Sequence, residues 1–164
     1  MRRHAHRLTI LAALVLGVAA SITACGGEQL AEQLGEQAID GQVDIEDDSI
    51  SITDQEGNEF AAGEGTEIPP TWPAEVPLFP DGTLVLVTSQ SDGTATALWE
   101  TTDTVDQAAA TYDDALTSGA FRLDQDASIG GSIIRTYVGE SHTVNVTVAE
   151  VSGSTNLSIA VIPK

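Results

Sequence analysis

Apolar and polar residues alternate with a period of two near the C-terminus of the chain. Every second residue of 144–148 is valine, and every second residue of 157–161 is leucine, isoleucine or valine. Because successive side chains of a strand point to opposite faces of a sheet, this spacing predicts strands at 143–151 and 157–162, each with one buried face.

Four shorter runs, rich in apolar and β-branched residues, predict the other strands of the same region. Residues 83–88 and 94–101 flank the turn-forming sequence 89–93, which predicts a hairpin. Residues 121–124 and 133–138 follow, and two consecutive glycines lie between them. Since short turns connect most of these strands, we expect them to be antiparallel.

Helical periodicity replaces the alternation between the second and the third of these strands. We predict a helix with Asp103 as its N-cap, Asp106 near its positive end and Gly119 as its stop. Its apolar stripe consists of Val105, Ala108, Ala109, Tyr112 and Leu116. One striped helix and about six strands, in the order ββαββββ, predict an α+β fold in residues 81–164, a two-layer sandwich with the helix packed on an antiparallel sheet.

The residues after Cys25 predict a small annex, 25–62, in front of this domain. Leucine, leucine and alanine recur at every fourth position of 28–39 among Glu and Gln, which is typical of a short amphipathic helix. Between residues 43 and 60, apolar and polar residues alternate around two acidic turns, which predicts a hairpin of two or three strands. An element of this size is not stable alone, so we expect it to pack on the main domain or to stay loosely ordered.

Five of the six prolines fall within residues 63–80. Proline fixes φ and lacks the backbone N–H group, so this composition favours an extended linker between the annex and the domain. Trp72 and Phe79 add apolar bulk that a free linker would not carry, and we expect one of them to plug into the domain. Recognition of this segment by a partner protein is the alternative interpretation.

The first 24 residues have the layout of a secretory signal peptide, in which Arg2, Arg3 and Arg7 precede an uncharged apolar run. Ile22-Thr23-Ala24-Cys25 then resembles the lipobox of bacterial lipoproteins, which implies cleavage before Cys25 and a diacylglycerol on its thiol. A plain signal peptide and an uncleaved anchor are the alternatives, although a spanning helix needs roughly 20 apolar residues. Cys25 is the only cysteine, so the chain forms no internal disulfide.

Acidic residues dominate the part that remains after such a cleavage. Residues 25–164 contain all 25 acidic residues but only Arg122, Arg135 and Lys164 as basic ones, which gives a net charge of −22. A surface of this charge repels nucleic acid and anionic lipid headgroups, so the membrane is expected to hold the chain through the lipid on Cys25. Solubility or adaptation to salt explains the acidity, and binding of divalent cations or of a cationic partner is the alternative.

Residues 25–164 offer few groups for catalysis. Their only histidine is His142, and Ser141 beside it would point to the opposite face of a strand, so the two do not form a nucleophile and base pair. The carboxylates and glycine of 54–59 do not match the spacing of an EF-hand, and turn formation explains them, with a weak calcium site as the alternative. We therefore predict that the chain is not an enzyme and has no cofactor and no metal site.

The segment from Trp72 to Thr83 contains the motif Pro-x-x-Val-Pro-Leu-Phe-Pro-x-Gly, and a hairpin and a capped helix that ends in Leu-Thr-Ser-Gly-Ala-Phe follow it. This arrangement resembles a group of bacterial envelope lipoproteins of the high-GC, actinobacterial type. The chain departs from their pattern at Thr111, where an aromatic residue is common, and at Ala120, which is inserted before Phe121. The motifs are structural, so the resemblance implies export and anchoring to the outer face of the cell membrane but no catalytic residues.

Two functions agree with these observations. The first is a non-catalytic binding or scaffold module that engages another envelope protein. The second is a carrier that holds a small apolar ligand or a lipid between helix and sheet. The residues expected to contact such a partner or ligand are Trp72, Phe79, Trp99, Tyr112 and Phe121.

Overall fold

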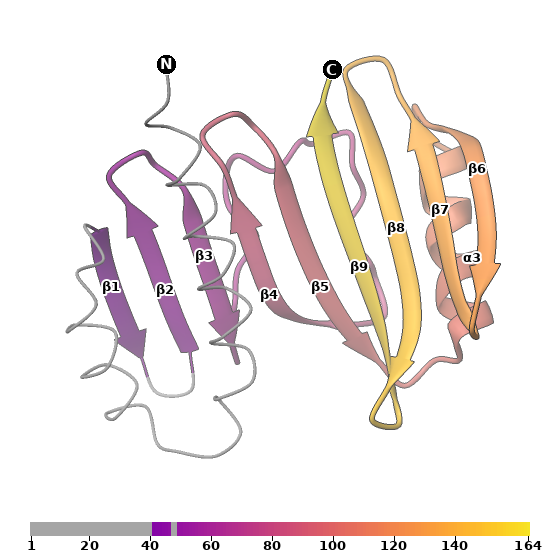
Figure 1. Cartoon of the computed structure of the whole chain (residues 1–164), viewed down its shortest axis with the longest axis horizontal. Helices are drawn as coiled ribbons and strands as arrows, with labels where there is room; N and C mark the ends of the chain where they lie inside the picture. Colours follow the sequence, from indigo (N-terminus) through magenta and orange to yellow (C-terminus); the bar gives the residue numbers. More distant parts are fainter. Residues whose placement is uncertain (1–40, 47–48) are drawn as a thin grey trace. The chain divides into compact units, whose positions relative to one another are not determined.

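The structure of the chain, a computed structural model, describes residues 41–46 and 49–164. Their strands form a single antiparallel sheet in the order β1-β2-β3-β4-β5-β9-β8-β7-β6 (Figure 1). The strands are β1 (Gly41–Glu46), β2 (Ser49–Asp54), β3 (Glu59–Gly63), β4 (Thr83–Ser89), β5 (Ala95–Thr101), β6 (Arg122–Ile129), β7 (Ser132–Val138), β8 (His142–Val151) and β9 (Ser154–Pro163). The described helix is α3 (Val105–Thr117).

The expected two-layer α+β sandwich with about six strands is wrong. The sheet has nine strands, and the described helix is only 13 residues long and packs mainly against β6 to β9. The difference arises at β3, which pairs with β4 through the register Ala62↔Leu86. Because of this pairing, the strands expected in the annex extend the main sheet instead of forming a separate hairpin.

Helix α3 begins one residue later than the sequence indicates. Its N-cap is Thr104, not Asp103, because the Thr104 hydroxyl accepts a hydrogen bond from the backbone N–H of Gln107 while the Gln107 side chain accepts from the backbone N–H of Thr104. This reciprocal pair is a capping box. The last helical residue is Thr117. Beyond it, the backbone N–H of Gly119 donates a hydrogen bond to the carbonyl oxygen of Leu116.

The 19 residues between β3 and β4, here called the proline-rich segment (64–82), cross the same face of the sheet as α3. In Figure 1 both lie behind the sheet, whose viewed face carries neither. Trp72, Val76 and Phe79 of this segment are buried, which confirms that the apolar residues of the expected linker pack against the domain. We call the face covered by α3 and the proline-rich segment the inner face, and the opposite one the outer face.

The hydrophobic core lies between these covering elements and the inner face. Apolar side chains at alternate positions of the central strands form this core. Among them, Ala97 and Trp99 of β5 and Leu157 and Ile159 of β9 are almost fully buried. The strictly alternating valines of β8 complete the core beside them. The strands at 143–151 and 157–162 are therefore confirmed, each with one buried face.

Several expectations lie outside the described residues. These are the signal peptide 1–24, the lipid site Cys25, the amphipathic helix 28–39 and the acidic turn at 47–48. No helix among the described residues is long and apolar enough to cross a membrane.

Candidate functional site

The two tryptophans expected to contact a partner or ligand contact each other. Trp72 of the proline-rich segment and Trp99 of β5 are in edge-to-face contact, with ring centroids 6.2 Å apart. The indole N–H of Trp72 donates to the carbonyl oxygen of Val76 at 3.0 Å, so the polar atom of this buried ring has its partner. The segment is thereby closed into a tight loop over β5.

The other three of these aromatic residues lie in the same core. Phe79 packs edge to face on Tyr112 of α3, with ring centroids 6.3 Å apart, and the Tyr112 hydroxyl donates to the carbonyl oxygen of Pro77 at 2.7 Å. Phe121 is buried against Gly139, where a Cβ atom would lie 2.6 Å from the phenyl ring. The space in which a carried ligand was expected is thus filled by the side chains that were expected to line it.

Polar groups gather where α3 crosses the edge of the sheet. The Arg135 guanidinium on β7 donates from Nη1 to the carbonyl oxygen of Ala109 at 3.2 Å, and it lies 3.8 Å from Asp113 and 3.4 Å from Asp126. The contact with Asp126 involves Nε, whose geometry does not make a hydrogen bond. The Tyr137 hydroxyl donates to Asp113 Oδ1 at 2.7 Å. This cluster ties the helix to β6 and β7.

Both tyrosines are held in their neutral form. Burial raises the pKa of Tyr112 well above its ordinary value, because a phenolate inside the core would lose its hydration. Burial also raises the pKa of Tyr137, and the hydrogen bond to the Asp113 carboxylate raises it further. Neither group is therefore a base at neutral pH.

His142 lies near the start of β8 and is mostly buried. Its Nδ1 atom is 2.7 Å from Oε1 of Glu75 in the proline-rich segment. Beside it, the Lys164 ammonium group donates to the carbonyl oxygen of Gly139, and the backbone N–H of Lys164 donates to Ser141. These contacts hold the proline-rich segment and the C-terminus against the start of β8, so their role is structural.

The acidic turn between β2 and β3 is organised by one carboxylate. Asp54 accepts hydrogen bonds from the backbone N–H groups of Glu56 and Asn58 and from the Asn58 side-chain amide, at 2.7 to 2.9 Å. Burial opposes the ionised form, but these hydrogen bonds outweigh it and lower the pKa of Asp54. The carboxylate oxygens of Asp54 that a calcium ion would need therefore accept hydrogen bonds within the turn. The described residues contain no group of three or more His, Cys, Asp or Glu side chains that could hold a metal ion.

The outer face shows a feature that the sequence pattern did not predict, namely two adjacent rows of side chains without a charge. One row crosses β6, β7, β8, β9, β5 and β4 through Gln125, Thr136, Asn145, Ala160, Thr96 and Thr88. The other crosses the same strands through Ala127, Ile134, Thr147, Ser158, Leu98 and Leu86. Part of the signal was present in the sequence, since the polar residues of β4 and β9 are Thr, Ser and Asn and not the abundant Asp and Glu.

The first row becomes apolar over β1 to β3, and the second row is apolar from β1 to β5. We call this region the outer patch, and it consists of Val43, Ile45, Ile50, Ile52, Phe60, Ala62, Leu86 and Leu98. Ile50 and Ala62 are buried, whereas Val43 and Ile45 are 37% and 38% exposed. No described helix covers this patch, because α3 lies on the inner face.

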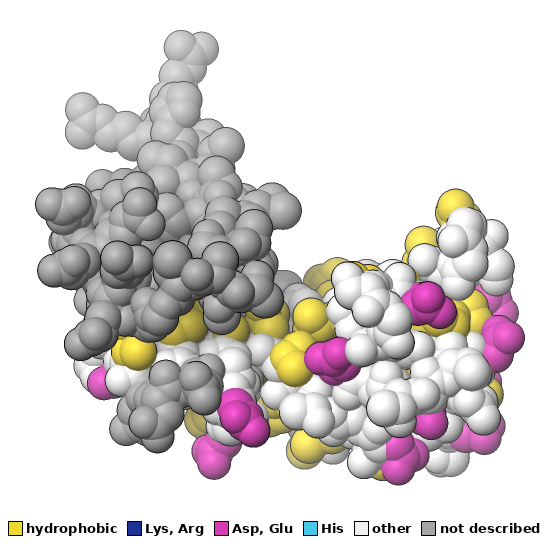
Figure 2. Space-filling model, turned by 90° about the horizontal axis from the view of Figure 1, so that it is seen from below, with side chains coloured by type: hydrophobic (Ala, Val, Ile, Leu, Met, Phe, Trp, Pro, Cys, Tyr) yellow, Lys and Arg dark blue, Asp and Glu magenta, His cyan; other side chains and the backbone are white. Residues whose placement is uncertain are grey.

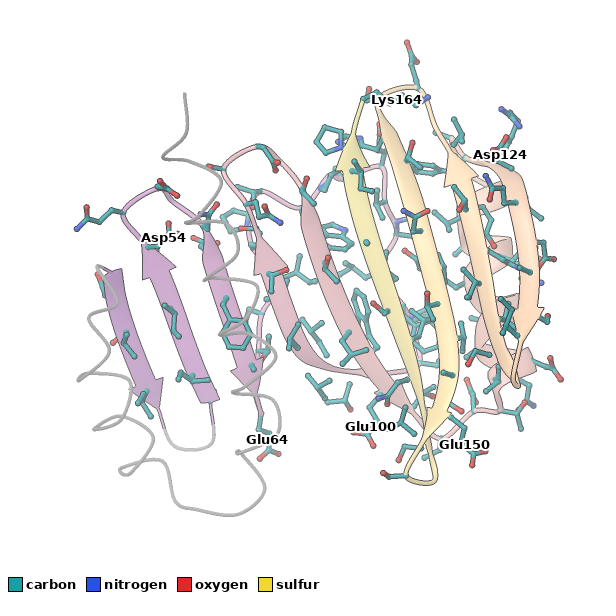
Figure 3. The ribbon with its side chains drawn as sticks, in the orientation of Figure 1. Asp54, Glu64, Glu100, Asp124, Glu150 and Lys164 are labelled. Carbon is teal, nitrogen blue, oxygen red and sulfur yellow. The ribbon has the colours of Figure 1, made fainter. Side chains whose placement is uncertain are left out.

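Acidic residues surround these rows at the ends of the strands. Figure 3 looks onto the outer face and shows Asp54 and Lys164 at one end of the sheet and Glu64, Glu100 and Glu150 at the other. Figure 2 looks onto the second of these ends, where acidic side chains are scattered over the described surface and no basic one is seen. The two rows are thus uncharged, and the charged residues labelled at the strand ends are acidic except for Lys164.

A scan against protein-family models and a search of curated proteins both return no match to this chain.

Proposed function

We propose that this chain is an exported lipoprotein, held at the outer face of the cell membrane by lipid on Cys25, and that its sheet is a non-catalytic binding or scaffold module. The observation that carries the proposal is the order of basic residues, apolar run and Ile22-Thr23-Ala24-Cys25 at the N-terminus. The only cysteine of the chain stands at the cleavage point of that pattern. A lipid-modified thiol accounts for its position.

Binding is favoured over carriage of a ligand by the packing of the core. Trp72, Trp99, Phe79 and Tyr112 fill the space between the covering elements and the sheet with ring-to-ring contacts. A ligand could enter only if these rings separated, at the cost of their buried contacts. The outer face, in contrast, offers a broad neutral surface to another protein.

The anchor is tested by feeding cells an alkyne analogue of palmitate and measuring the mass of the N-terminal peptide. We expect label on the wild-type chain, a mature sequence that starts at Cys25 and no label on Cys25→Ala, which is released from the membrane. Thr23→Ala is the matched control, since it changes the same motif without removing the thiol, and it should stay labelled. An unlabelled wild-type chain, or a Cys25→Ala chain that stays on the membrane, contradicts the proposal.

A further inference from the structure

We propose that residues 28–39 form a helix that covers the outer patch within the same chain. This segment lies outside the described residues, and its helical character is the expectation from its sequence. The described sheet requires a cover at this patch, and the segment fits it in position, size and charge. Only the consequence for the distance from the membrane rests on the proposed function above.

The sheet changes the face that it buries between β3 and β4. One row across the inner face runs through Ser51, Ala61, Val87 and Ala97. Val87 and Ala97 lie in the core, whereas Ser51 at the β2 end of this row is exposed. On β2 the outer-facing Ile50 is buried instead. The polar side of β2 is therefore its inner side, and its apolar side is its outer side.

Two residues of the outer patch are more deeply buried than the described residues explain. Ile50 and Ala62 are only 7% and 6% exposed, although no described helix or strand crosses the outer face over them. Val43 and Ile45 of β1, on the same face, are 37% and 38% exposed. An apolar sheet face is stable only when another element packs on it, so a cover centred on β2 and β3 is required.

Residues 28–39 directly precede the strands that need this cover. Only Asp40 separates them from Gly41, the first residue of β1. A segment joined to the sheet by one residue stays beside it, so its effective concentration at the patch exceeds that of a second copy or of a separate protein. A helix of this length that contains Gly35 is not stable alone, so it needs an apolar surface to pack on.

The expected helix matches the patch in size and charge. Residues 28–39 would form a helix about 18 Å long and about 10 Å wide. The six residues of β2 extend over about 20 Å, and three strands spaced about 4.8 Å apart span about 10 Å, the width of β1 to β3. The patch and the apolar stripe of the helix carry no charge, and the acidic residues recur on the opposite side of the helix. The stripe consists of Leu30, Leu34 and Ala38, and the acidic side of Glu28, Glu32 and Glu36.

Docking of this helix would hold the sheet near the membrane. Glu28 is three residues from Cys25, so the helix would begin within about 10 Å of the lipid. Without docking, the 16 residues from Cys25 to Gly41 could extend over about 55 Å. A helix of this width leaves the rows over β6 to β9 uncovered, so the module would present them to a partner close to the membrane.

Crosslinking between two introduced thiols tests the contact in membranes that hold the lipidated chain. Ala31→Cys places one thiol beside the stripe, and Ile52→Cys places the other in the patch. Thr53→Cys is the matched control for the second position, because this next residue of β2 is exposed on the inner face. With a bismaleimide that spans about 10 Å, the width of a helix, we expect the Ile52→Cys pair to crosslink within one chain at least about tenfold faster than the Thr53→Cys pair.

A charged residue in the stripe links the crosslink to the docked helix. Leu34→Asp, added to the chain with thiols at 31 and 52, should lower the rate to that of the Thr53→Cys control, because a carboxylate would enter an apolar contact. Gln33→Asp adds the same charge outside the stripe and should leave the rate unchanged. Circular dichroism and urea unfolding check that each variant keeps its sheet.

Three outcomes overturn the proposal. Equal rates for the Ile52→Cys and Thr53→Cys pairs would mean that the segment does not prefer the outer face. A crosslinked product with twice the mass of the chain would assign the patch to a second copy. If Ile52→Cys alone reacts with a monofunctional maleimide as fast as Thr53→Cys alone, the patch is uncovered. Failure of the anchor is distinguishable, because the maleimide would then also label an unmodified Cys25.

Discussion

The hydroxyl group of Tyr112 lies 2.7 Å from the carbonyl oxygen of Pro77 and donates a hydrogen bond to it. The two residues are 35 positions apart and belong to the two elements that cover the inner face. The bond therefore joins α3 to the proline-rich segment directly, above the sheet that both cover. Phe79, which packs on the Tyr112 ring, adds an apolar contact to the same junction.

Tyr112→Phe should lower the free energy of unfolding by about 1 to 2 kcal/mol, because the carbonyl oxygen of Pro77 would keep its place without its donor. Urea unfolding followed by tryptophan fluorescence measures this, since Trp72 and Trp99 report on the proline-rich segment and the sheet. Thr117→Ala is the control, because it removes an exposed hydroxyl-to-carbonyl bond within α3. If the free energy of unfolding falls equally little in both variants, the junction does not contribute to stability.

Stability should fall steeply at alkaline pH. The pKa values of Tyr112 and Tyr137 are raised above the ordinary value of 10.0, so above about pH 10 the unfolded chain releases protons that the folded chain retains. The unfolded state then binds fewer protons, and the free energy of unfolding decreases as pH rises. The contribution of both tyrosines is fully present below pH 10 and is lost above it.

The Tyr112→Phe, Tyr137→Phe double variant is the control for this pH dependence. Urea unfolding between pH 8 and 11.5 should show a steep decline for the wild type and a shallower one for the double variant. Parallel curves would mean that other groups cause the decline.

Gly139→Ala should destabilise the protein by about 1 to 3 kcal/mol through overpacking. The added Cβ atom would lie 2.6 Å from the ring of Phe121, which is itself buried and cannot move aside freely. Gly119→Ala is the matched control, since the nearest atom to its Cβ is 3.5 Å away. Thermal unfolding should show a lower melting temperature for Gly139→Ala and little change for Gly119→Ala, and equal melting temperatures would contradict the clash.

The sequence predicted β8 and β9 well because one face of each strand is buried in the core. It predicted β6 only in part, as residues 121–124, because every residue of this strand, Arg122–Ile129, is exposed and no alternating burial marks its length. Periodicity in β8 and β9 reports that burial directly, and the alternating valines of β8 all lie in the core. Local patterns do not, however, state which strand pairs with which. The pairing of β3 with β4 joins residues on either side of the 19-residue proline-rich segment, and this long-range contact turned six expected strands into a sheet of nine.

The aromatic residues show the same difference between local sequence patterns, which could be predicted, and long-range packing, which could not. Their bulk predicted that Trp72 or Phe79 would pack on the domain, and both are buried. The sequence did not indicate that they would fill the space against Trp99 and Tyr112, because that depends on where the segment crosses the sheet. The neutral outer face was missed for a different reason, since only the pairing register places Thr, Ser and Asn of separate strands in continuous rows.

The sequence and the structure assign the N-cap of α3 to different residues, and two substitutions test which assignment is right. The sequence indicated Asp103 as N-cap, whereas the structure gives this role to Thr104, whose hydroxyl accepts from the Gln107 backbone N–H at 3.3 Å. Thr104→Ala should therefore cost about 1 kcal/mol of unfolding free energy, the usual loss for a removed N-cap. Asp103→Ala should cost at most about 0.5 kcal/mol, because its carboxylate would act only through the helix dipole. Urea unfolding of both variants measures the difference, and a larger loss for Asp103→Ala would assign the cap to Asp103.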